Sequence, residues 1–174
     1  MKLLIDYLQL CWFLNNPIDL HPSRAFLWKN ILFYVVSGII VEANISDPAD
    51  ATLEVAMRTI VALLLLSTQI LFTKKSSVFY QLQTAVFICE NFIMTLGIGV
   101  EIFDAFAQGS QYEEYPIYLG ILLVLWYLAI ISYIFKQVFA FHYANCIGLA
   151  FLYFGLTYGG PFLLMEVIWL QIPK

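Results

Sequence analysis

The sequence predicts an all-α integral membrane protein, a single bundle of about five transmembrane helices with a short N-terminal interfacial helix. Hydrophobic residues make up 62% of the chain and charged residues only 11%, whereas soluble domains are about 45–50% apolar and about 25% charged. A soluble fold of this size could not cover so much apolar surface, so much of it must face lipid. The apolar residues are also gathered into segments long enough to cross a bilayer, which takes about 20 residues.

The first apolar segment, residues 3–14, is too short to cross a bilayer. In a helix, Asp6 and Gln9 lie opposite a face of apolar residues. This pattern predicts either a helix lying in the membrane interface or a helix packed on the end of the bundle. The apolar face consists of Leu3, Leu4, Tyr7, Leu8 and Cys11.

Five later segments are the predicted spans. Asp47 followed by Pro48 is a typical helix start for the second span, and a serine at 76 or 77 is placed to cap the third. The longest polar connection is residues 101–114, and residues 159–161 (Gly-Gly-Pro) predict a kink or break in the last span. The spans are residues 26–45, 53–73, 78–100, 116–135 and 139–170.

The charged residues outside the spans predict an orientation. With five crossings, the connections at one end hold lysine and arginine, and those at the other hold only acidic residues. Basic residues stay cytoplasmic, which predicts a cytoplasmic N-terminus and a C-terminus outside. The basic set is Lys2, Arg24, Lys29, Lys74, Lys75 and Lys136; the acidic set is Asp47, Asp50, Glu54, Glu101, Asp104, Glu113 and Glu114.

Ionisable groups inside a bilayer are costly, and they are candidates for function. At about 1.5 Å per residue, Glu42 and Arg58 both fall in the outer third of their spans, where an ion pair would fasten two consecutive helices. Glu90, with Asn91 beside it, falls near the middle of the third span. Glu166 would lie at a similar height if the last helix crosses completely.

Glu90 has a structural and a functional interpretation. A carboxylate in hydrocarbon normally takes up a proton, and the acid could then donate a hydrogen bond to a backbone carbonyl or to Gln69. Alternatively, Glu90 is a proton or cation site, or a polar contact for a helix of another subunit. If Arg58 reaches Glu90 as well as Glu42, the three side chains form one network in the outer leaflet.

Small residues recur along one face of the last span. They allow helices to approach closely, either within the bundle or between chains, and we expect packing within the bundle. The set is Ala144, Gly148, Gly155 and Gly159.

The sequence contains no motif for catalysis, a cofactor or a metal. The three cysteines, Cys11, Cys89 and Cys146, are isolated, which is typical of apolar packing residues. The two histidines have no ligand spacing, and a net charge of −4 argues against nucleic acid as a partner. An enzyme is therefore not predicted, although an intramembrane enzyme built around Glu90 stays a third class of hypothesis.

The chain resembles the Yip1-type small membrane proteins. The resemblance is carried by a short N-terminal segment with an Asn-Pro pair, residues 13–17 (FLNNP), which leads into five spans of this order and polarity. It implies a non-enzymatic membrane protein that works through partners.

These observations favour an accessory or scaffold subunit that binds another membrane protein or a second copy of itself. The alternative is a small proton- or cation-coupled transporter, or a subunit of one, with Glu90 as the coupling group and Arg58 and Glu42 as its gate. The short loops indicate a bacterial inner membrane.

Overall fold

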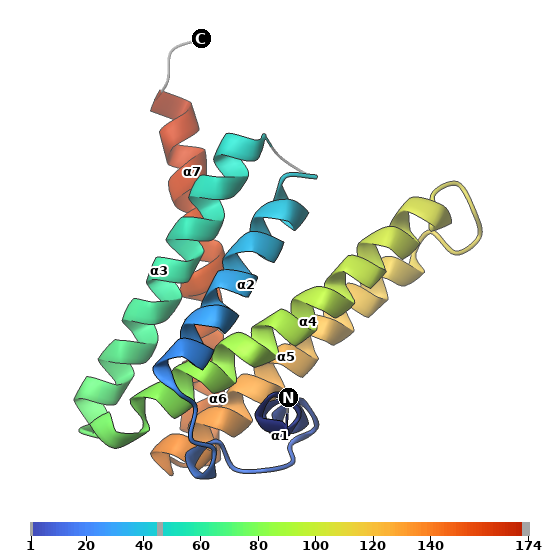
Figure 1. The fold of residues 1–174 in the computed structure, drawn as a ribbon. Helices are drawn as coiled ribbons and strands as arrows, with labels where there is room; N and C mark the ends of the chain where they lie inside the picture. The colour runs from blue at the N-terminus through green and yellow to red at the C-terminus, as the bar shows by residue number, and fades with distance from the viewer. Residues whose placement is uncertain (1, 45–46, 172–174) are drawn as a thin grey trace.

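A computed structural model describes residues 2–44 and 47–171, with side chains up to residue 165. Its described part is helical and contains no strand (Figure 1). Five described helices are long and apolar enough to cross a membrane, which confirms the predicted fold class. In order the elements are α1 (Lys2–Leu8), η1 (Gln9–Trp12), η2 (Pro17–Asp19), α2 (Arg24–Glu42), α3 (Pro48–Thr73), η3 (Ser76–Val78), α4 (Phe79–Ala107), α5 (Tyr115–Phe139), α6 (Tyr143–Phe154), η4 (Gly155–Gly159) and α7 (Gly160–Gln171).

The helices form two arms that diverge from a shared base (Figure 1). One arm is made of α2, α3 and the α6–α7 segment, and the other is the antiparallel hairpin of α4 and α5. At the base, α4 packs against α2, and α5 packs against α6. The buried residues of the hairpin accordingly cluster in its base, at 81–91 in α4 and 127–139 in α5, and its outer half leans away from the first arm.

The N-terminal segment packs on the bundle, which is the second of the two predicted arrangements. Tyr7, Leu10 and Cys11 are fully buried, and burial raises the pKa of the Tyr7 hydroxyl. The Trp126 indole N–H of α5 donates to the Cys11 carbonyl at 2.9 Å. The Tyr133 hydroxyl donates to the Asn15 carbonyl at 2.7 Å. These contacts bind the segment to α5 at the base of the bundle.

Two predicted helix starts have different outcomes. The Asp47 side chain accepts a hydrogen bond from the Ala49 amide at 2.9 Å, and Pro48 is the first residue of α3, as expected. The serine cap of the third span was wrong, because α4 follows the 3₁₀ turn Ser76–Val78 and has no side-chain cap. The backbone closes that turn instead, since the Val78 amide donates to the Lys75 carbonyl at 3.1 Å.

The third span is longer than predicted. Residues 101–114 were expected to connect two spans, but α4 continues to Ala107, so only residues 108–114 connect α4 to α5. Glu101 is exposed and Asp104 is half-buried, so the helix continues past them without enclosing either carboxylate. The last residue of α4, Ala107, is buried.

The last span is interrupted, but slightly earlier in the chain than the predicted residues 159–161. A π-helical turn, Gly155–Gly159, separates α6 from α7. Pro161 has no amide N–H to donate to the Thr157 carbonyl, so a regular α-helix cannot continue through this point. A widened turn is one way in which a helix accommodates such a loss.

The two ends of the bundle differ in charge. The Lys75 ammonium donates to the Val138 carbonyl at 2.7 Å, which joins the turn before α4 to the end of α5. This end also holds α1 and the start of α2, so the basic connections lie together (Figure 1). The chain leaves α2 and enters α3 at the opposite end, where Asp47 and Asp50 lie.

Candidate functional site

A cleft of about 430 Å³ lies between the two arms. It exists because the outer half of the α4–α5 hairpin leans away from α2 and α3. Its walls are mostly apolar, and Gly97 of α4 and Gly120 of α5 leave room in them, since an added Cβ at either position would meet no atom within 4 Å. Its polar lining is Tyr34, Glu42, Arg58, Glu90, Glu101, Tyr127 and Tyr158.

Glu90 lies at the floor of the cleft, where α4, α5 and α6 meet. Its side chain is only 1% exposed. One carboxyl oxygen, Oε1, accepts hydrogen bonds from the hydroxyls of Tyr127 at 2.7 Å and Tyr153 at 2.9 Å. The other oxygen, Oε2, has no hydrogen-bond partner among the described residues. Two hydroxyls from two other helices therefore hold the carboxyl group in place and leave one oxygen unmatched.

The predicted bond between Glu90 and Gln69 is absent. The buried Gln69 amide oxygen also has no partner within the described part of the chain. Gln69 lies four residues before the end of α3, whereas Glu90 lies eleven residues after the start of α4. At about 1.5 Å per residue, this places the two side chains at heights that differ by about 10 Å.

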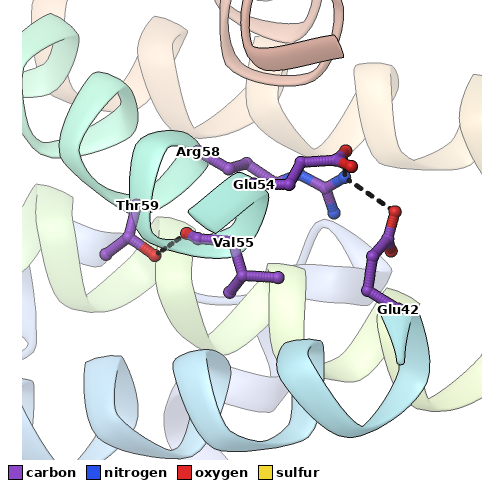
Figure 2. A network of polar contacts seen from close by, with 5 residues as sticks. All are labelled: Glu42, Glu54, Val55, Arg58 and Thr59. Carbon is purple, nitrogen blue, oxygen red and sulfur yellow. Dashed lines mark hydrogen bonds and ion pairs between the residues drawn. The ribbon is translucent and has the colours of Figure 1, made fainter. Parts of the chain in front are cut away.

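Arg58 of α3 joins two carboxylates on one wall of the cleft (Figure 2). Its Nη2 lies 3.7 Å from Glu42 Oε1, so the predicted pair between consecutive helices is formed. The same nitrogen lies 2.6 Å from Glu54 Oε1, and the guanidinium carbon lies 4.7 Å from the centre of the Tyr158 ring.

The sequence analysis assigned Glu54 to the loop acids and missed its ion pair with Arg58. The i, i+4 spacing of Glu54 and Arg58 on a helix is the signal that reveals it.

The five polar residues that the sequence places inside the membrane, Glu42, Arg58, Glu90, Asn91 and Glu166, are not joined in one network among the described residues. Arg58 and Glu90 line the same cleft, but Arg58 forms its described ion pairs with the other two carboxylates, and none with Glu90. Asn91 points elsewhere, donating to the Asn30 carbonyl at 3.1 Å beside a second cavity of about 390 Å³. The side chain of Glu166 lies outside the described residues.

The small-residue face of the last span does not pack inside the bundle, which corrects the prediction. Gly148 and Gly155 are exposed, and a Cβ at Gly148, Gly155 or Gly159 would meet no atom within 4 Å. Ala144 is exposed as well. The opposite face is the buried one, and it carries Cys146, Ala150, Tyr153 and Thr157.

Two cysteines that are far apart in the sequence meet in the core. The sulfur atoms of Cys11 and Cys89 are 3.5 Å apart, both residues are fully buried, and both are free thiols. No sequence signal could have paired them, since they are 78 residues apart. The contact adds a further link between the N-terminal segment and α4, next to Glu90.

The cleft has an excess of acidic groups. Glu42, Glu54 and Glu90 lie at or beside it with a single described cation, Arg58. Groups of this kind are costly to expose to acyl chains. The site can therefore accept hydrogen-bond donors or positive charge from whatever occupies the cleft.

No family model, curated protein or solved structure matches this chain. The fold defines its class, an all-α bundle in which five of the described helices are long and apolar enough to cross a membrane.

Proposed function

We propose that the chain is an accessory subunit of a membrane protein complex and that it receives a transmembrane helix of a partner protein in its cleft. The observation that carries this proposal is a cleft with apolar walls and a charged floor, opening between helices that are long enough to span a membrane. Lipid chains could fill the space, but they would leave Glu90 and the Arg58 cluster facing hydrocarbon. A partner helix can cover the apolar walls and also match the polar groups, so it is the more favourable occupant.

The dimensions of the cleft support a helix as the occupant. Its volume of about 430 Å³ accommodates several side chains from one face of a helix. Gly97 and Gly120 remove side chains from the α4 and α5 walls, and small residues at such positions let two helix backbones approach closely. In this proposal the chain lies in a bacterial inner membrane with its basic end in the cytoplasm. The Yip1-type resemblance, which the comparisons do not test, agrees with a role through partners.

Crosslinking from within the cleft tests this proposal. A photo-reactive amino acid replaces Gly97, and the protein is illuminated in its native membranes. We expect one crosslinked protein of defined mass, and filling the cleft with Gly120→Phe should reduce its yield about tenfold or more, which corresponds to a loss of at least about 1.4 kcal/mol in binding. Both positions have space for a side chain, so the variants should fold.

The matched control places the same photo-reactive group at Gly148, an equally open glycine on α6 that does not line the cleft. Crosslinks of equal yield from both positions, unaffected by Gly120→Phe, would mean that the chain meets its neighbours only by random contact. The proposal would then be wrong.

A second candidate function is proton-coupled transport, which the burial of Glu90 on the floor of an open cleft favours. Purified chain in liposomes that contain a pH-sensitive dye separates the two candidates. Under the leading proposal, we expect proton flux no faster than in protein-free liposomes. A flux that Glu90→Gln abolishes would instead establish the second candidate, because glutamine keeps the hydrogen bonds but cannot carry a proton.

A further inference from the structure

We infer that the helix in the cleft carries a basic side chain in its membrane-spanning part, and that the positive group of this side chain binds Oε2 of Glu90. The inference rests on the proposed function and adds the chemistry by which the partner is recognised.

The hydrogen bonds of Glu90 leave a place for such a group. Both tyrosine hydroxyls donate to Oε1, and Oε2 is buried without a partner among the described residues. An ionised carboxylate can accept about four hydrogen bonds, so half of this group is unused. Glu90 lines the cleft, so a donor that enters the cleft comes next to this carboxyl group.

The nearby positive charge is already engaged. Arg58 binds Glu54 at 2.6 Å and Glu42 at 3.7 Å, and its guanidinium group lies over the Tyr158 ring. Glu42 and Glu54 thus already share the Arg58 guanidinium group, and Glu90 is a third carboxylate in addition to these two. At or beside the cleft, the described residues therefore place three carboxylates with one guanidinium group, and Glu101 adds a further acid to the lining. An occupant with a positive charge complements this excess.

Other occupants fit less well. A wholly apolar helix would leave the Glu90 oxygen buried and unmatched, which is costly. A divalent metal ion requires several oxygen ligands at once, and the described residues contain no group of three or more acidic, histidine or cysteine side chains placed to hold one. A lysine or arginine on a helix supplies both the apolar surface and the donor. In the bilayer such a residue is itself costly to leave unpaired, so the binding would satisfy both partners.

Synthetic transmembrane peptides test the inference without knowledge of the natural partner. The probe is a leucine- and alanine-rich helix of about 20 residues with one lysine at its centre, and its control has leucine at that position. Energy transfer from the labelled full-length protein to a labelled peptide measures binding in vesicles. We expect the lysine peptide to bind at least about tenfold more tightly than the leucine peptide, because only lysine supplies a charged donor to the acidic cleft.

A variant of Glu90 links this preference to the carboxylate. Glu90→Gln keeps an oxygen that can accept from both tyrosines but removes the negative charge, so it should bring the affinities of the two peptides to within about twofold of each other. Glu113→Gln, in the connection between α4 and α5 and outside the cleft lining, is the matched control and should retain the preference.

The outcomes separate the inference from the proposed function. Equal binding of both peptides to the wild-type protein would overturn the inference, and so would failure of the lysine peptide to bind; neither comparison requires a variant to fold. A preference for lysine that survives Glu90→Gln would also overturn it. Docking of a native helix in the cleft is decided independently by crosslinking from Gly97.

Discussion

Replacing Arg58 with methionine is expected to lower the free energy of unfolding by about 3 kcal/mol, the lower end of the cost of breaking a buried ion pair, because these side chains are only partly buried. The substitution keeps an unbranched, flexible side chain but removes the guanidinium group, and so leaves Glu42 and Glu54 next to each other without their shared cation. Reversible unfolding in mixed micelles, followed by circular dichroism, measures the change. Arg24→Met is the control, because Arg24 is exposed at the start of α2, and its loss should change stability by no more than about 0.5 kcal/mol.

The same cluster allows a rescue experiment. Replacing Arg58 with methionine together with Glu42→Gln and Glu54→Gln removes the cation and both carboxylates that bind it. We expect the triple variant to recover most of the lost stability, since the loss comes from uncompensated charges and an uncharged replacement of a buried pair is often neutral. If the triple variant is as unstable as the single one, the Arg58 side chain stabilises the fold through packing on Tyr158 rather than through its ion pairs.

Replacing Leu10 with alanine is expected to lower the free energy of unfolding by about 2–5 kcal/mol, the usual cost of a cavity left by a leucine. Leu10 is fully buried in the 3₁₀ turn that follows α1. Leu14, four residues further along, is 57% exposed, so Leu14→Ala should change stability by about 0.5 kcal/mol or less. The same unfolding assay compares the two variants.

This pair of leucines distinguishes the two arrangements that the sequence allows for the N-terminal segment. A segment that only lies in the membrane interface would lose similar amounts of stability at both positions, and such a result would contradict the packed arrangement. A large loss at Leu10 alone would place residues 2–20 within the folded core, in line with the hydrogen bonds from Trp126 and Tyr133 of α5.

Local chemistry made several features predictable. A span is recognised from hydropathy because lipid contact selects apolar residues along the whole helix, and the Asp47–Pro48 start of α3 depends on atoms only two or three residues apart. The Glu42–Arg58 pair was predictable because a short connection holds consecutive helices antiparallel, so that heights along the two helices can be compared.

Features that depend on distant residues were not predictable. The Glu90 carboxyl group is held by Tyr127 and Tyr153, which are 37 and 63 residues away. The sequence identifies Glu90 as unusual but contains no signal for which of eleven tyrosines contact it. The small-residue face was predicted to be internal for the same reason, since composition does not reveal which side of a helix meets the rest of the bundle.

The sequence by itself determined that this chain forms apolar helices of membrane-spanning length, which stretches of the chain they occupy, and which ionisable residues lie within them. The apolar composition of a segment and the residues that start its helix act within that segment, so these features can be predicted without knowing which helices lie next to it. Only the tertiary structure decided that α4 and α5 lean away from α2 and α3, and that Glu90 and the Arg58 cluster share the resulting cleft. That outcome depends on how side chains of different helices fit together, a property that no single segment contains.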